Sequence, residues 1–443
     1  MQLVNQHDVF AIPHRDGYLV YAPLAGRVVY ANANCVAQLR GYLETGERDA
    51  VDPQIRTRLG GLDWLNVDRR PEPLPSQRPF RPTFVTLFLT NRCNLRCTYC
   101  YARAGEFDGC TMPTDVWQAA IDFVVGNACE VRRPVGVGFH GGGEPTLAWD
   151  ALTSAVEYAR EAVAREKVNG LTFGLATNGV MSNDRAEYVA RTFRTVTLSL
   201  DGDADLQNRQ RPRLCGGGSF DAVMAFVEVL RRHGTAFVIR CTVTENNVSR
   251  LAELVDFYVD RTGCKLLHFE PVFLSGRCRN IPSAVPLPKL FADNFVAALD
   301  RAVARGARVR FSAARVMGAF ASFCGCSQDP FNVTHEGDVT ACFEVCHAAD
   351  PLAKTYHFGR FDCETGHFAF DQERLAHLRS LTVHNKPLCA RCFAKWNCAG
   401  DCPVKGLQPY AAVDGESPRC RMIQSITRAM LERALEPGTC RVF

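Results

Sequence analysis

The feature that most constrains the fold is an alternation of short apolar segments with segments of helical periodicity, which begins at Thr83. The apolar segments are 83–89, 135–139, 171–176, 195–200, 236–243 and 265–272. The segments with helical spacing between them include 114–125, 149–164, 220–232 and 249–260. Uninterrupted apolar character predicts strands that are buried on both faces, as in a parallel sheet. Six strand–helix units predict an α/β fold with an open, partial (βα)6 TIM-type barrel, while a closed eight-stranded barrel or a doubly wound sheet also fits the periodicity.

A smaller unit precedes this barrel, which we place at residues 83–275. Residues 1–80 predict an α+β unit, because two strand-like segments flank the turn at Leu24-Ala25-Gly26 and helical spacing begins at Cys35. The proline-rich segment 71–82 reads as a linker. This unit has two interpretations, a cap that packs on the barrel or a domain that docks a leader peptide.

The chain after the barrel changes character. Residues 276–320 predict a connecting helix at 287–305 and a short strand at 308–312. Residues 321–443 are rich in cysteine, punctuated by glycine and poor in long periodic runs. Such a composition is typical of a domain organised around metal centres.

Composition narrows the possible environments and partners. The N-terminus has no signal-peptide pattern, and no apolar run approaches the ~18–20 residues of a membrane span, so we expect a cytoplasmic protein without a membrane partner. In a reducing compartment, the 21 cysteines favour metal or redox sites over disulfides. A net charge of +4 without a Lys/Arg run gives no support for nucleic-acid binding.

Three of these cysteines, Cys93, Cys97 and Cys100, form a C-x3-C-x2-C loop directly after the first predicted strand. Three thiolates on one loop can bind three irons of a 4Fe–4S cluster and leave the fourth iron open to another ligand. A zinc loop with a distant fourth ligand is the alternative. The second predicted strand ends in FHGGGEPTL, where glycines allow close approach of a ligand and Glu144 can accept hydrogen bonds from an ammonium group.

The stretch CNLRCTYC followed by GGGEP resembles the radical SAM superfamily. The resemblance implies a 4Fe–4S cluster on Cys93, Cys97 and Cys100 that binds S-adenosylmethionine and cleaves it to a 5′-deoxyadenosyl radical, which abstracts hydrogen from substrate. Arg240 is an alternative to Arg211 for the cofactor carboxylate. The cofactor-binding residues implied by the resemblance are Tyr99, Gly142, Gly143, Glu144, Asn178, Ser199, Asp201 and Arg211.

The C-terminal cysteines resemble a SPASM domain, which implies two auxiliary 4Fe–4S clusters. A zinc ribbon is the alternative. By position, the distal cluster takes Cys389, Cys392, Cys398 and Cys420. The nearer cluster takes Cys324, Cys342 and Cys402, with Cys326 or Cys346 as its fourth ligand or with an open iron.

The combined resemblance implies a peptide maturase that forms a thioether or carbon–carbon cross-link in a ribosomally made precursor, with a flavodoxin or ferredoxin as electron donor. The alternatives are an anaerobic sulfatase maturase, a small-molecule dehydrogenase of the same superfamily, and a zinc-binding scaffold. Sulfatase maturases carry an aspartate directly after the cysteine that matches Cys342, where this chain has Phe343. Glu344 is the candidate proton acceptor nearby.

Overall fold

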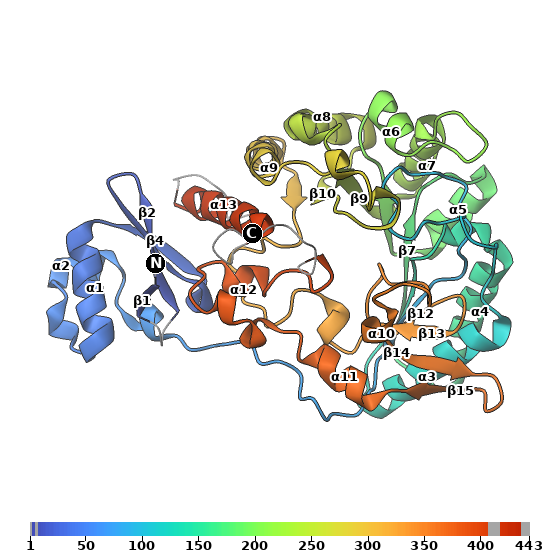
Figure 1. Cartoon of the computed structure of the whole chain (residues 1–443), viewed down its shortest axis with the longest axis horizontal. Helices are drawn as coiled ribbons and strands as arrows, with labels where there is room; N and C mark the ends of the chain where they lie inside the picture. Colours follow the sequence, from blue (N-terminus) through green and yellow to red (C-terminus); the bar gives the residue numbers. More distant parts are fainter. Residues whose placement is uncertain (1, 5–7, 406–416, 436–443) are drawn as a thin grey trace.

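Six parallel strands form the barrel sheet of the structure, a computed structural model that describes residues 2–4, 8–405 and 417–435. The barrel lies on the right-hand side of the view in Figure 1. The strands are β5 Phe84–Leu87, β6 Val135–Phe139, β7 Leu171–Thr177, β8 Thr195–Ser199, β9 Ala236–Val243 and β10 Leu266–Pro271. They pair in chain order without a reversal, and β11 Arg308–Arg310 adds a parallel strand beside β10. The sheet is therefore an open, barrel-type sheet, which confirms the predicted fold class over a closed barrel or a doubly wound sheet.

Helices between the strands cover the outer face of this sheet. They are α3 Thr114–Val131, α4 Trp149–Arg165, α5 Asn183–Thr192, α6 Ala204–Gln210, α7 Phe220–His233, α8 Leu251–Phe257 and, after β10, α9 Pro288–Ala304. Apolar residues at helical spacing, such as Val116, Ala120 and Val124 of α3, are buried against the strands. The predicted helix 249–260 is α8, which ends at Phe257 and continues as one π-type turn over Tyr258–Thr262.

The C-terminal part extends the same sheet past β5. The short strand β12 Asn332–Val333 pairs parallel with β5, and three antiparallel strands follow outward. These strands are β13 Asp338–Thr340, β14 His357–Asp362 and β15 His367–Phe370. The helices of this part are α10 Ala353–Tyr356, α11 Gln372–Arg379, α12 Lys395–Cys398 and α13 Pro418–Arg433. The barrel and the cysteine-rich region therefore share one 11-stranded sheet.

The N-terminal unit has its own antiparallel sheet and its own core. Its strands are β1 Gln2–Val4, β2 Val9–His14, β3 Gly17–Ala22 and β4 Arg27–Ala31, and its helices are α1 Ala33–Thr45 and α2 Pro53–Arg58. The predicted turn is present, with Gly26 in the left-handed conformation at φ 61°. Asn32 caps α1 by accepting a hydrogen bond from the Cys35 backbone N–H at 2.8 Å.

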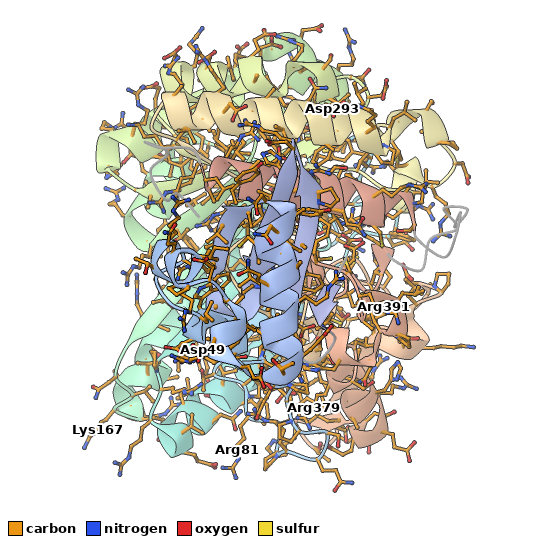
Figure 2. The ribbon with its side chains drawn as sticks, turned by 90° about the vertical axis from the view of Figure 1, so that its left-hand side faces the viewer. Asp49, Arg81, Lys167, Asp293, Arg379 and Arg391 are labelled. Carbon is orange, nitrogen blue, oxygen red and sulfur yellow. The ribbon has the colours of Figure 1, made fainter. Side chains whose placement is uncertain are left out.

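This unit packs against the C-terminal helices at one end of the molecule, where Figure 1 places it apart from the barrel strands and Figure 2 shows α1 in the foreground. Tyr21 donates a hydrogen bond to Asn397 Oδ1 at 3.0 Å, and Trp396 Nε1 donates to Asp8 Oδ2 at 3.0 Å. Arg379 fixes the linker by donating to the carbonyl oxygens of Ser76 and Arg78. None of the described helices is long and apolar enough to cross a membrane.

Candidate active site

The loop that carries Cys93, Cys97 and Cys100 follows β5 at the carboxyl end of the sheet. All three cysteines line a cavity of about 210 Å³. The loop is anchored where the Arg96 and Thr98 backbone N–H groups donate to the carbonyl oxygens of residues 212 and 210. Burial raises the pKa of Cys93 to about 12 and that of Cys97 to about 11. These thiols therefore ionise at neutral pH only when a metal binds the thiolate, which fits a cluster ligand.

The glycine segment after β6 packs directly on the start of this cysteine loop. Gly143 N donates to Thr90 O at 2.7 Å, and Glu144 N donates to Arg92 O at 2.8 Å. A Cβ atom on Gly143 would lie 2.0 Å from Arg92 O, and one on Gly142, whose φ is +62°, would lie 2.9 Å from Thr90 O. The glycines therefore allow the backbone of the cysteine loop to approach closely, while the approach of a ligand stays a prediction.

Glu144 is buried at the edge of the cavity, with 3% of its surface exposed. Its Oε1 accepts hydrogen bonds from Thr177 Oγ1 at 2.7 Å and from Thr146 Oγ1 at 2.8 Å. Its Oε2 accepts from Asn178 N at 2.8 Å. These bonds oppose the effect of burial, which raises the pKa of Glu144. They also hold the carboxylate in one orientation, with acceptor capacity left on Oε2.

The other predicted cofactor residues divide into two groups. Tyr99, Asn178, Ser199 and Arg211 line the cavity together with Gly142 and Gly143. Asp201 is fully buried behind them. It accepts hydrogen bonds from Arg211 Nε at 3.0 Å, Thr242 N at 2.9 Å and the Tyr99 hydroxyl. The carboxylate of Asp201 therefore positions Arg211 and Tyr99, and it is not among the groups that line the cavity.

Charged residues from the C-terminal part, Glu344 and Lys405, form a further wall of the cavity. Lys405 Nζ lies 3.3 Å from Glu270 Oε1, 3.7 Å from Glu344 Oε1 and 4.4 Å from the centre of the Phe273 ring. Glu344 Oε2 is buried, without a hydrogen-bond partner in the described part of the chain. Burial raises the pKa of Glu344. This wall can bind a charged group or exchange a proton with a molecule in the cavity.

The charged wall includes three residues whose place in it was not predicted from the sequence, Lys405, Glu270 and Arg240. Glu270 lies at the carboxyl end of β10, which is a signal that parallel-sheet topology offers. Lys405 follows Cys402 by three residues and has no comparable signal. Arg240, considered only as an alternative to Arg211, lines the cavity and lies 3.1 Å from His268 Nδ1.

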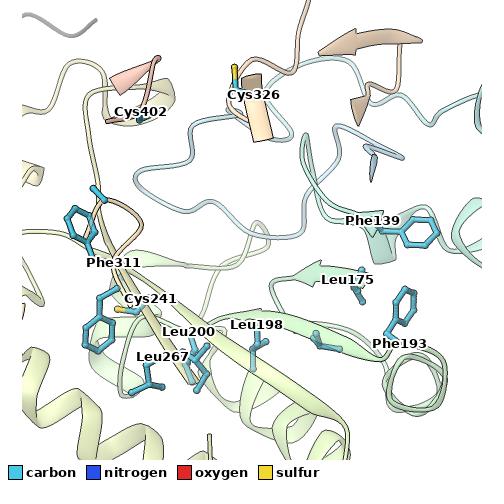
Figure 3. Close-up of a cluster of buried hydrophobic side chains, with 14 of the residues drawn as sticks. Phe139, Leu175, Phe193, Leu198, Leu200, Cys241, Leu267, Phe311, Cys326 and Cys402 are labelled. Carbon is cyan, nitrogen blue, oxygen red and sulfur yellow. The ribbon is translucent and has the colours of Figure 1, made fainter. Parts of the chain in front are cut away.

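The structure brings Cys324, Cys326, Cys342 and Cys402 together. The side chains of Cys324 and Cys326 are hydrogen-bonded, and the charges of Cys342 and Cys402 add to the effects that raise the pKa of Cys326. Figure 3 shows Cys326 and Cys402 apart from the core side chains of the barrel strands. Cys346 instead packs with Phe88 and Ala102 beside Cys100.

A second group of thiols gathers near the start of α13. Cys392 and Cys420 lie close enough to Cys389 that a thiolate on either raises the pKa of the Cys389 thiol. Cys389 and Cys392 raise the pKa of Cys398 in the same way. Ser417 Oγ donates a hydrogen bond to Cys420 Sγ at 3.4 Å. Each of the two groups thus offers four thiols, which is the number that a fully protein-bound iron–sulfur cluster or a structural zinc ion requires.

The structure is an open parallel barrel whose strands end at a three-thiol loop beside a small cavity. This arrangement defines a class of enzyme that works with a bound metal centre. Residues 87–258 match the family described as the radical SAM superfamily. The chain therefore carries a radical SAM domain and is a radical SAM enzyme, which implies one 4Fe–4S cluster and S-adenosylmethionine.

Comparisons with individual proteins agree with this family and fold. The mycofactocin maturase MftC of Mycolicibacterium smegmatis is 28% identical over 352 residues, covering 76% of this chain and 82% of that protein. The structure of native anSMEcpe with bound AdoMet superposes with a TM-score of 0.62 at 20% identity, over 79% of this chain and 97% of that one. Streptococcus suis SuiB bound to precursor peptide SuiA gives a TM-score of 0.52 at 15% identity, over 94% of this chain and 97% of SuiB.

Proposed function

We propose that this enzyme is a peptide maturase that forms a thioether or carbon–carbon cross-link in a ribosomally made precursor peptide. The observation that carries the proposal is the cavity itself, which is lined both by the cysteine loop and by Glu344 and Lys405 of the C-terminal part. When bound, the 4Fe–4S cluster and S-adenosylmethionine supply a 5′-deoxyadenosyl radical that abstracts hydrogen. The relatives named above include a maturase and a protein that binds a precursor peptide, which supports a peptide substrate.

In this proposal, the residues around the cysteine loop bind the cofactor. Cys93, Cys97 and Cys100 hold the cluster. Glu144 accepts hydrogen bonds from the cofactor ammonium on Oε2, and Arg211, held by Asp201, donates to the cofactor carboxylate. The remaining cavity groups that we assign to the cofactor are Tyr99, Gly142, Gly143, Asn178 and Ser199.

We assign an auxiliary cluster to each four-thiol group of the C-terminal part. Cys326 is the fourth ligand of the nearer group, because its thiol contacts Cys324 whereas Cys346 lies beside Cys100. A cluster with four protein ligands has no iron free for a substrate thiolate, so in this proposal it would accept the electron that the substrate loses after hydrogen abstraction. For each cross-link the substrate loses two hydrogen atoms, one to the 5′-deoxyadenosyl radical and one as a proton to a base and an electron to the cluster. A flavodoxin or ferredoxin would supply the electron that starts the reaction.

Glu344 is the proton acceptor in this proposal, because its unpartnered Oε2 lies on the cavity wall. Phe343, which replaces the aspartate of sulfatase maturases, is 42% exposed, and its ring lies 4.6 Å from that of His140. A phenyl ring cannot accept a proton, so the cross-linking reaction is favoured over formylglycine formation. The N-terminal unit, in the same proposal, docks the leader of the precursor.

The proposal is tested by anaerobic co-expression with a short peptide encoded beside this protein, followed by mass spectrometry of the peptide. We expect the loss of two hydrogen atoms per modification, and thiol labelling then distinguishes a thioether from a carbon–carbon bond. A Cys97→Ala variant should leave the peptide unmodified. An unmodified peptide with the iron-loaded wild-type enzyme would contradict the proposal.

A further inference from the structure

Two histidines and a glutamate converge outside the cysteine groups and outside the cavity described above. His335 and Glu336 lie in the turn between β12 and β13, and His347 lies in the loop that follows Glu344. One ring nitrogen of each histidine and a carboxylate oxygen of Glu336 lie within 4.8 Å of one another. The two imidazole rings meet edge to face, with centroids 5.2 Å apart.

Both histidines have a nitrogen that the protein does not satisfy. His335 is 2% exposed, and its Nδ1 is buried without a hydrogen-bond partner among the described residues. The same holds for Nε2 of His347. Buried polar atoms nearly always have a hydrogen-bond partner, in the protein or in ordered water, or bind an ion, so two unsatisfied nitrogens in one cluster mark a place where a ligand can bind. Burial also lowers the pKa of both rings, to about 4 for His335, so both are neutral and carry a free lone pair at pH 7.

The backbone holds His335 and Glu336 in place. Gly337 has a φ of +84°, and its N–H donates to Thr334 O at 2.9 Å, which closes the turn that carries His335 and Glu336. Thr334 Oγ1 accepts hydrogen bonds from the backbone N–H groups of Glu336 at 3.3 Å and Asp338 at 3.1 Å. A binding site built on a fixed turn requires little reorganisation to bind an ion.

We propose that His335, Glu336 and His347 bind a divalent transition-metal ion, with Zn²⁺ the best match to two imidazoles and one carboxylate. Ion binding requires the three side chains, whose atoms lie within 4.8 Å of one another, to rotate to ligand distance. Glu336 is exposed, so the fourth position faces solvent and takes water. The ion joins the β12–β13 turn to the loop that carries Glu344. His347 also lines a second cavity with Tyr101 and Glu344, so the ion stiffens a wall next to the cysteine loop.

The test uses the full chain, purified anaerobically with its iron, equilibrated with Zn²⁺ and then desalted. We expect one zinc per chain beyond the iron content, with zinc-edge X-ray absorption showing nitrogen and oxygen ligands at about 2.0–2.1 Å. His335→Ala and His347→Ala should each weaken zinc retention at least tenfold while the iron content stays unchanged. The matched control is His367→Ala, an exposed histidine of β15, which should retain zinc like the wild type.

Three outcomes would overturn the proposal. The first is a sulfur shell at about 2.3 Å around zinc, which would place the ion at cysteines. The second is equal zinc retention in the wild type and the two histidine variants. The third is the absence of retained zinc in an iron-loaded wild-type protein. Unchanged iron in the variants separates loss of this site from loss of the fold.

Discussion

Replacement of Gly143 by alanine tests whether contact between the glycine segment and the cysteine loop builds the cluster site. The new Cβ would lie 2.0 Å from Arg92 O, 2.7 Å from Arg92 C and 2.8 Å from Arg92 N. All three are backbone atoms, so no side-chain rotation can relieve the contact. Since real Cβ atoms keep at least 3.0 Å from such atoms, the two segments must separate by about 1 Å.

The energetic cost follows from this displacement. Overpacking of this size costs about 1–3 kcal/mol, and weakening of the hydrogen bonds to Thr90 O and Arg92 O adds about 1–3 kcal/mol. We therefore expect Gly143→Ala to lower the free energy of unfolding by about 2–6 kcal/mol and to reduce iron bound at the loop. Urea denaturation under anaerobic conditions and iron analysis of the purified protein measure both effects.

Gly126→Ala is the matched control. Gly126 lies within α3, and a Cβ there would meet nothing within 4 Å. Alanine in a helix interior is more favourable than glycine by about 0.5–1 kcal/mol, so this variant should be slightly stabilised with normal iron. The same denaturation midpoint and iron content in Gly143→Ala and Gly126→Ala would refute this role for the contact between the glycine segment and the cysteine loop.

Two further predictions concern the thiol groups and the charged wall. Cys326→Ala should lower the iron content by up to about four atoms per chain, whereas Cys346→Ala should leave it unchanged; equal losses would contradict the assignment of the fourth ligand. Because burial raises the pKa of Glu344, a proton acceptor there loses activity as the pH falls through a value above the usual ~4.3 of glutamate. Glu344→Gln should remove this loss of activity at low pH and slow product formation about 10²–10⁴-fold. The control Glu364→Gln, on an exposed turn, should match the wild type. An unchanged pH profile in Glu344→Gln would exclude Glu344 as the proton acceptor.

The central strands could be predicted closely, because each is a short segment buried on both faces and is therefore apolar throughout. The predicted 135–139 and 236–243 are the observed β6 and β9. The strand β12 could not be predicted from apolar periodicity, because it has only two residues, Asn332 and Val333, and is defined by its pairing with β5. Periodicity also missed β2, because Pro13 lies within that strand and cannot donate a ladder hydrogen bond.

The site residues that lie at strand ends could be predicted from the sequence. The contacts between segments that are distant in the sequence could not. Asn178 and Ser199 follow strand topology and line the cavity. Lys405 reaches Glu270 across 135 positions of sequence, and no local spacing indicates that contact. The burial of Asp201 behind Arg211 likewise depends on three partners from separate segments, so it could not be read from the residues around Asp201.

The pairing of β5 with β12 has a consequence for how the chain reaches its fold. β5 is synthesised early, but its second neighbour comes from the cysteine-rich region near the other end of the chain. At ~5–20 residues per second, the outer edge of β5 therefore stays unpaired for on the order of ten seconds or more during synthesis. A chain cut before residue 331 would keep that edge permanently exposed and prone to aggregate, although its barrel sequence is complete. The first strand of the barrel thus depends on late-synthesised residues, and the region that gathers the thiols also completes the sheet.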